Sequence, residues 1–210
     1  MTENTEDTMR QNGRGYTTSE NKTVYDSEKA QQGVRLILEA MGEDPDAPEL
    51  VETWERRVPE VFETFSRGNR IDTKPEMRTF DVESTELVIK TSIPLYSFCK
   101  HHLLPYYGTV HMAYRPNGKV AGLSKLARYV RWRARRITIQ EELTRDLADG
   151  FANELEAEAV LIEVTATHMC EAMRGVEAKT ETTTRATAGN PTEAERRRFS
   201  DTVRRTEGTI

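Results

Sequence analysis

Residues that bind soft metals or transfer protons near neutral pH are scarce in this chain. Its 210 residues include only two cysteines and four histidines, and all six lie between Cys99 and Cys170. Two cysteines are too few for the disulfide framework of a small secreted domain. Because nothing outside this stretch competes for such chemistry, we expect any metal-dependent or acid–base site to lie within it.

Long apolar runs are also absent. No segment approaches the ~20 consecutive apolar residues of a membrane-spanning helix, and the first residues lack the pattern of a secretory signal. We therefore expect a cytoplasmic protein with no membrane partner, in which both cysteines are free or metal-bound. Residues 1–25 are polar, contain no apolar run and are predicted to form a disordered N-terminal arm.

Acidic residues are missing from one segment, although they exceed basic residues in the chain as a whole. Between Lys100 and Gln140 there are nine lysines and arginines and no aspartate or glutamate, while the rest of the chain carries 21 basic and 35 acidic residues. A basic segment inside an acidic chain favours a local anion site over general affinity for nucleic acid. A solvated basic helix face explains the same charges equally well.

Beyond the arm, the sequence predicts a helical region over residues 26–68, a core over 69–190 and a polar tail over 191–210. The tail is predicted to contain a short helix that begins after Thr192, which can cap it.

Two helices are predicted in the first of these regions. The first covers Ser27–Met41, with Ser27 as its cap and Gly42 as its end. The second covers Leu50–Ser66, and Pro59 inside it predicts a kink or a restart.

The core is predicted to contain two strands, two helices and two strands, in that order. The helices follow from apolar residues at helical spacing, one set from Leu123 to Ala134 and the other from Leu143 to Leu155. The four predicted strands are Thr85–Ile93, Gly108–Tyr114, Ala159–Thr167 and Val176–Thr187.

Five of the six cysteines and histidines form two clusters that can meet around one metal ion. Cys99 and His102 are three residues apart, and His168 and Cys170 follow a predicted strand and project on the same face. We assign Cys99, His102 and Cys170 to a zinc ion, with water at the fourth position, so that His101 and His168 are free to move protons. A purely structural Cys₂His₂ site fits the spacing equally well.

His111 lies in the middle of a predicted strand. We expect it to be an ordinary half-buried histidine rather than a ligand.

At these clusters the chain resembles GTP cyclohydrolase I, a zinc enzyme family that opens the imidazole ring of GTP to make dihydroneopterin triphosphate. The resemblance covers roughly residues 34–205. It rests on four motifs, which are Cys99-Lys100-His101-His102-Leu103-Leu104-Pro105, Gly122-Leu123-Ser124-Lys125-Leu126-Ala127-Arg128, Ile139-Gln140-Glu141, and Ala166-Thr167-His168-Met169-Cys170 with Met173-Arg174-Gly175.

The resemblance implies an α+β tunnelling fold. Its core has the order ββααββ, with an antiparallel sheet and helices on one face, and a helical N-terminal region precedes it. The resemblance also implies one zinc ion per subunit and a toroidal homodecamer whose active sites lie at subunit interfaces.

The resemblance further implies roles for three residues in the reaction. His168 protonates N7 of guanine, His101 assists the attack of water on C8, and Ser124 contacts the ribose or phosphate region later. Formate is then released and the ribose rearranges into the pterin ring.

Substrate binding is implied for a second set of residues. Glu141, with Gln140 beside it, matches the family's guanine-binding position, and a carboxylate suits the two donors of guanine. However, Thr138 and Glu141 also fit a capping box for the following helix.

For the triphosphate, the resemblance implies contacts from Lys125, Arg128, Arg174 and an arginine that we map to Arg56. The family usually has proline where Trp54 stands, and Trp54 serves equally well as a core anchor for its helix.

Two rival functions remain at this point. Other enzymes of the same fold need a three-histidine zinc site or a nucleophilic cysteine without zinc, which the Cys-His-Cys set does not match. A zinc-stabilised module that binds nucleic acid could use the basic residues 128–136. However, the same predicted helix also carries the apolar residues that are expected to face the core. Steep loss of affinity with salt would identify the latter.

Overall fold

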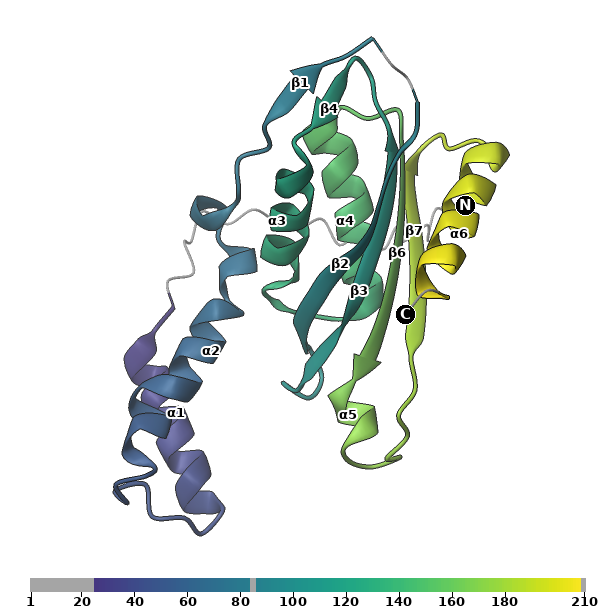
Figure 1. Cartoon of the computed structure of the whole chain (residues 1–210). Coiled ribbons are helices and arrows are strands. Elements are labelled where there is room, and N and C mark those ends of the chain that lie inside the picture. The colour runs from purple at the N-terminus through teal and green to yellow at the C-terminus, as the bar shows by residue number, and fades with distance from the viewer. Residues whose placement is uncertain (1–24, 84–85, 209–210) are drawn as a thin grey trace, which may run out of the picture.

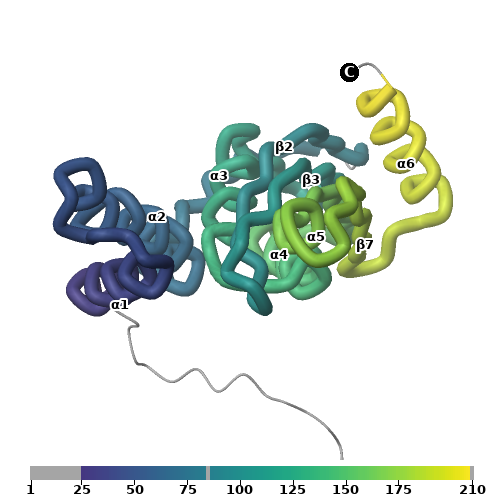
Figure 2. The backbone as a smooth tube through the Cα atoms, turned by 90° about the horizontal axis from the view of Figure 1, so that it is seen from below, coloured from purple at the N-terminus to yellow at the C-terminus, as the bar shows by residue number. Residues whose placement is uncertain are grey.

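The computed structural model describes residues 25–83 and 86–208, so the predicted N-terminal arm lies almost wholly outside the described residues. Within these ranges, no helix is long and apolar enough to cross a membrane. The elements of the N-terminal region are the helix α1 (Ser27–Ala40), the π-helix η1 (Thr53–Arg57) and the helix α2 (Val58–Thr64). They lie together beside the main body of the molecule, at the side opposite the C-terminal helix (Figures 1 and 2).

The start of α1 and the break at Pro59 follow from local chemistry. The cap is Asp26 rather than the predicted Ser27, because the Asp26 carboxylate accepts the Lys29 backbone N–H at 3.0 Å. Pro59 lies in the first turn of α2, directly after the π-helix. Pro59 has no N–H to donate, and it falls where the hydrogen-bond pattern changes, since the Val58 N–H still donates to the carbonyl of Thr53 in the π-helix. The predicted restart is therefore confirmed.

Trp54 anchors the linker between these helices. Its indole N–H donates to the carbonyl of Pro45 at 2.9 Å, and the guanidinium of Arg35 lies 5.0 Å from its ring centre. Arg35 in turn holds Asp46 through two hydrogen bonds of 2.7 Å. Trp54 thus has a structural role that accounts for its presence.

The core is built on a five-stranded sheet with the order β5-β2-β3-β6-β7. Neighbouring strands are antiparallel except for β5, which pairs in parallel with β2. The bounds of its strands are Val88–Cys99 for β2, Pro105–Arg115 for β3, Ile137–Thr138 for β5, Ala159–His168 for β6 and Thr182–Gly189 for β7. A separate two-stranded sheet joins β1 (Thr79–Asp81) to β4 (Lys119–Ala121).

Several predicted strand ends are wrong. The strand predicted to stop at Ile93 continues through Pro94 to Cys99. Proline is tolerated because β5 pairs only with the last two residues of β2, so β2 is an edge strand at Pro94. The other strands also shift, since β3 begins at Pro105 and β7 begins only at Thr182.

Two helices cover one face of this sheet, as Figure 1 shows. These are α3 (Leu123–Ala134) and α4 (Gln140–Leu155). Their buried side chains, such as Leu126 and Phe151, form one hydrophobic core with the inward side chains of β2, β3 and β6. The order β2-β3-α3-α4-β6-β7 confirms the predicted ββααββ core and the α+β class.

The C-terminal helix α6 (Glu193–Glu207) lies on the opposite face of the sheet (Figures 1 and 2). It has 15 residues, so the predicted short helix is wrong in length. Phe199 and Val203 pack in a small second hydrophobic cluster with residues of the sheet. This docking explains why a helix with so many charges is ordered.

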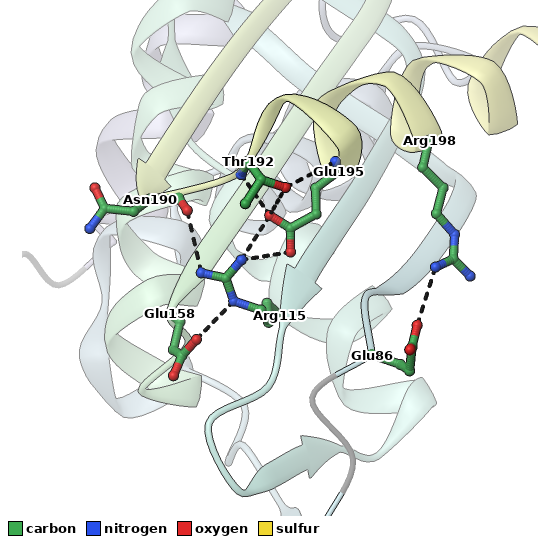
Figure 3. A network of polar contacts seen from close by, with 7 residues as sticks. All are labelled: Glu86, Arg115, Glu158, Asn190, Thr192, Glu195 and Arg198. Carbon is green, nitrogen blue, oxygen red and sulfur yellow. Dashed lines mark hydrogen bonds and ion pairs between the residues drawn. The ribbon is translucent and has the colours of Figure 1, made fainter.

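Arg115 of β3 fixes the start of α6 by ion pairs (Figure 3). Its guanidinium contacts Glu195 at 2.7 Å and Glu158 at 2.8 Å. Glu195 also completes a capping box with Thr192, the residue predicted to cap this helix. A second pair joins Arg198 to Glu86 at 3.2 Å.

Candidate metal centre and active site

Three side chains from two distant parts of the chain meet at one end of the sheet. The Sγ atom of Cys99 lies 3.7 Å from Nδ1 of His102 and 3.9 Å from Sγ of Cys170. The ligand atoms of all three residues lie within 4.8 Å of one another. Cys99 ends β2, and Cys170 lies in the short helix α5 (Met169–Ala172) that follows β6.

The turn between β2 and β3 places His102 beside Cys99. The Cys99 backbone N–H donates to the carbonyl of Leu104 at 2.8 Å, and the Leu103 N–H donates to the carbonyl of Cys99 at 2.9 Å. Leu103 has a φ of 53°, in the left-handed region that is rare for a branched residue. This tight turn brings the Cys-x-x-His motif together, and the Lys100 N–H, which donates to the carbonyl of Thr138 at 3.1 Å, ties it to β5.

The donor set and its spacing fit zinc. Tetrahedral ligands at ~2.3 Å for sulfur and ~2.0–2.1 Å for nitrogen lie about 3.5–3.8 Å apart. This is close to the 3.7 Å and 3.9 Å that separate Sγ of Cys99 from His102 and Cys170. A disulfide would need the two sulfurs at about 2.05 Å, and both cysteines are free thiols. With two thiolates and one imidazole, the group can hold zinc and leave one position for another ligand.

A cavity of about 360 Å³ opens beside these ligands. It is lined by Cys99, His101, His102, Ile139, Gln140, Glu141, His168, Cys170, Glu171 and Thr182. The predicted metal ligands and four of the other predicted site residues therefore come together. Three members of this lining, Ile139, Glu171 and Thr182, were not among the predicted site residues.

His168 is held between a ring and an amide. Its imidazole stacks on Tyr106 with ring centres 4.6 Å apart and planes 11° from parallel. Burial lowers the pKa of His168, although the nearby carboxylates of Glu141 and Glu171 act to raise it. Burial also raises the pKa of Tyr106 to about 12, so this ring stays neutral. Burial therefore favours the neutral form of the His168 ring.

Gln140 fixes which nitrogen of His168 carries hydrogen. Its amide nitrogen donates to the carbonyls of Val164 and Thr182 and to Oγ1 of Thr184, at 2.8–3.1 Å. The amide oxygen must then face Nε2 of His168, which is 2.8 Å away. A carbonyl oxygen only accepts, so Nε2 bears the hydrogen and Nδ1 is left for the cavity.

Glu141 presents an exposed carboxylate to the cavity at the start of α4. It has no hydrogen bond or ion pair with any described residue. The capping role considered for it is wrong, because Ile139 is the N-cap and no side chain caps this helix. Thr138 instead directs its hydroxyl toward the carbonyl of Ile139 and the carboxylate of Glu142.

The remaining predicted site residues lie away from this cavity. Ser124 and Lys125 are in the first turn of α3, and Arg128 on the same helix lines a different cavity. Arg174 is exposed after α5. Arg56 lies in η1 and pairs with glutamates of its own helical segment.

His111 was predicted to be half-buried, but it is buried, and it is not among the described lining residues of the metal-side cavity. Its Nδ1 accepts the Ser92 backbone N–H at 3.3 Å. Burial lowers its pKa. It is thus a structural histidine of the sheet.

Comparisons with known proteins identify the family of this chain. A family model described as GTP cyclohydrolase I matches residues 30–204. The chain is 45% identical to the GTP cyclohydrolase 1 of Clostridium perfringens over 165 residues, which are 77% of this chain and 89% of the relative. It is 47% identical to that of Carboxydothermus hydrogenoformans over 73% of this chain and 80% of the relative. It is 46% identical to that of Aquifex aeolicus over 73% of this chain and 82% of the relative.

The chain is also similar to a solved structure, the archaeosine synthase QueF-Like in the apo form. The TM-score is 0.43 and the identity 19%, and the match covers 52% of this chain and 100% of the other. This likeness is too weak to carry a functional argument.

Proposed function

Since the chain belongs to the GTP cyclohydrolase I family, it opens the guanine imidazole ring of GTP by hydrolysis, and we propose that Cys99, His102 and Cys170 hold the zinc ion of that reaction. The reaction releases formate and forms 7,8-dihydroneopterin triphosphate, a precursor of folate-type cofactors. One observation carries the metal assignment: the three ligand atoms lie within 4.8 Å of one another beside an open cavity.

When bound there, zinc supplies a Lewis acid that makes water a nucleophile near neutral pH. Two histidines beside the ligands, His101 and His168, are left to handle protons. Because both ligand cysteines must be reduced to bind a metal, we place the enzyme in the cytoplasm.

His168 is the proposed proton donor to N7 of guanine. Its Nε2–H is bound by Gln140, so its Nδ1 is the atom that can deliver a proton into the cavity. The Gln140 oxygen accepts the Nε2–H in both the neutral and the charged form of the ring. His168 can therefore gain and lose a proton at Nδ1 without turning. His101, exposed at the mouth of the cavity, assists the attack of water on C8.

Glu141 is the proposed guanine-binding residue. Its carboxylate lines the cavity and has no partner among the described residues, so it can accept both N1–H and the 2-amino group of guanine. Adenine offers no such pair of donors and would leave the carboxylate unpaired. Gln140 was also predicted to bind substrate, but its amide is engaged within the protein. We propose that it acts through His168.

The triphosphate requires cations that the metal-side cavity does not contain, since no lysine or arginine is among its described lining residues. We propose that Ser124, Lys125, Arg128, Arg174 and Arg56 complete the site across subunit boundaries in a homodecamer. None of these five residues is among the described lining residues of the metal-side cavity, which supports an assembled site.

Incubation of the purified protein with GTP tests this function. We expect formate and, after oxidation, a fluorescent pterin, and both should disappear with a zinc chelator and return when zinc is restored. Protein that contains zinc and binds GTP but releases no formate would refute the proposal.

A further inference from the structure

The contact between His168 and Gln140 does not by itself fix the plane of the imidazole ring. The ring is attached to the backbone through Cβ, and its Nε2 lies 2.8 Å from Oε1 of Gln140. A ring held at these two points is still free to rotate about the line that joins them, since the outer torsion of a histidine side chain has only broad preferences. Such a rotation would change the direction of Nδ1, the proposed proton-donating atom. A third contact is therefore needed to hold the ring.

Tyr106 supplies this contact with the flat face of its own ring. The two rings have centres 4.6 Å apart and planes 11° from parallel. The other five pairs of aromatic rings in the described part of the chain meet at 34–87°. A parallel ring covers the whole face of its neighbour and opposes rotation of that plane, whereas a tilted or edge-on ring leaves part of the face open.

Tyr106 is itself held in place by the sheet. It is fully buried in β3 and lies directly opposite Ser97 of β2 on one side and His168 of β6 on the other. Its hydroxyl faces the Ser97 side chain, which donates to the carbonyl of Arg136 at 3.1 Å. Tyr106 is not among the described lining residues of the metal-side cavity. Any effect of Tyr106 on a reaction in that cavity must therefore pass through a neighbouring side chain.

We propose that Tyr106 is a positioning residue, whose ring fixes the plane of His168 so that Nδ1 keeps its direction toward the metal-side cavity. Gln140 then holds the edge of the imidazole, and Tyr106 holds its face. A displacement of ~1 Å in a reacting group can cost about 10²-fold in rate, so a loosened imidazole should slow the chemical step without weakening the binding of GTP. The effect on rate rests on the proposed function, whereas the orientation of the ring does not.

Steady-state kinetics with GTP test the effect on rate. Tyr106→Leu removes the flat ring, and Tyr106→Phe keeps it. We expect kcat to fall about tenfold or more in Tyr106→Leu, with little change in KM, and to stay near that of the parent in Tyr106→Phe. The matched control is Tyr114→Leu, the same change at a buried tyrosine near the other end of β3, which should keep its kcat. An unchanged kcat in Tyr106→Leu, or equal losses of kcat in both leucine variants, would overturn the proposal.

Zinc content separates this role from support of the metal ligands, because Tyr106 also lies near Cys99. Tyr106→Leu should contain as much zinc as the parent. A loss of zinc that accompanies the loss of kcat would show that Tyr106 acts through the metal centre, and would overturn the proposal. Should Tyr106→Leu fail to fold, Tyr106→Met carries the test, since a methionine side chain adapts to irregular spaces but has no flat ring.

Proton NMR of histidine-labelled protein gives a readout that does not depend on activity. In the parent, in Tyr106→Phe and in Tyr114→Leu, the Nε2–H of His168 should give a signal that is protected from exchange with water. In Tyr106→Leu the signal should broaden or disappear, and a signal that stays protected would overturn the proposal. If the signal behaves as expected but the zinc-containing parent releases no formate from GTP, the proposed function fails and the role of Tyr106 in orienting His168 stands.

Discussion

Nε2 of His168 lies 2.8 Å from Oε1 of Gln140, and this contact joins the end of β6 to the first residue of α4. The glutamine side chain is buried, and its amide nitrogen is bound to β6 and β7. The orientation of the proposed proton donor is therefore set by the packed core rather than by the substrate.

Replacing Gln140 with leucine should lower kcat about tenfold or more, with little change in KM, because His168 loses the acceptor that fixes its ring. The loss of donors to the carbonyls of Val164 and Thr182 should also lower the free energy of unfolding by about 1–3 kcal/mol. Nitrogen NMR of His168 should show that the Nε2–H form no longer dominates. Thr184→Val is the control, since it perturbs the same amide but does not contact His168. If the Gln140→Leu variant is destabilised but its kcat is unchanged, Gln140 has only a structural role.

The two adjacent histidines of the turn should differ sharply in their effect on metal content. His102→Ala removes a proposed ligand, so purified protein should contain little zinc and have no activity. His101→Ala should retain zinc and lose activity. Mass spectrometry of the native protein and metal analysis distinguish the two. Equal zinc in both variants would contradict the ligand assignment, whatever the effect on rate. Cys170→Ser should behave like His102→Ala.

Glu141→Ala should raise KM for GTP by about 10- to 100-fold, because the guanine donors lose a charged acceptor. Its melting temperature should stay near that of the parent, since Glu141 caps no helix and pairs with no described residue. Glu142→Ala is the neighbouring control. It removes an exposed contact to Lys100 of 3.2 Å and should leave KM nearly unchanged. A raised KM with an unchanged melting temperature would indicate that Glu141 binds the substrate. A lower melting temperature with an unchanged KM would indicate that it stabilises the helix.

Acid should weaken the docking of α6 through Glu195. Burial acts to raise the pKa of this carboxyl, but the Thr192 backbone N–H and Arg115 outweigh it and hold the pKa below its ordinary value. A lowered pKa means that the ionised form stabilises the fold above the unfolded-state pKa, and that this contribution is lost as the pH falls below about 4.

Urea unfolding across pH checks this expectation. Glu195→Gln should cost about 1–3 kcal/mol near neutral pH and much less in acid. Glu193→Gln, at an exposed position of the same helix, is the control. If the Glu195→Gln variant and the parent lose stability in parallel as the pH falls, a group other than Glu195 causes the loss of stability in acid.

The sequence predicted those features that depend on residues close together in the chain. The Cys-x-x-His motif closes within one turn, and the apolar spacing of α3 and α4 follows from a single helical period. The strand and helix patterns also predicted the ββααββ order, and the two clusters of cysteine and histidine predicted Cys170 as a distant ligand, in agreement with the family motifs. Capping was misjudged at Thr138, since its pairing with Cys99 makes it part of a strand and leaves Ile139 as the cap.

Long-range contacts could not be predicted in this way. The partners of the Gln140 amide lie between 24 and 44 residues away, and no local pattern identifies them. The stacking of Tyr106 on His168 depends on the register of β3 against β6. The docking of α6 depends on two apolar side chains in an otherwise charged helix.

The three proposed ligands differ in how firmly the protein supports them. Cys99 is buried at the end of a strand, and Cys170 follows β6, which is paired on both sides and buried along most of its length. His102 stands exposed at the tip of a hairpin. When a competing chelator removes the ion, we therefore expect the His102 imidazole to dissociate first and the two cysteine sulfurs to dissociate last.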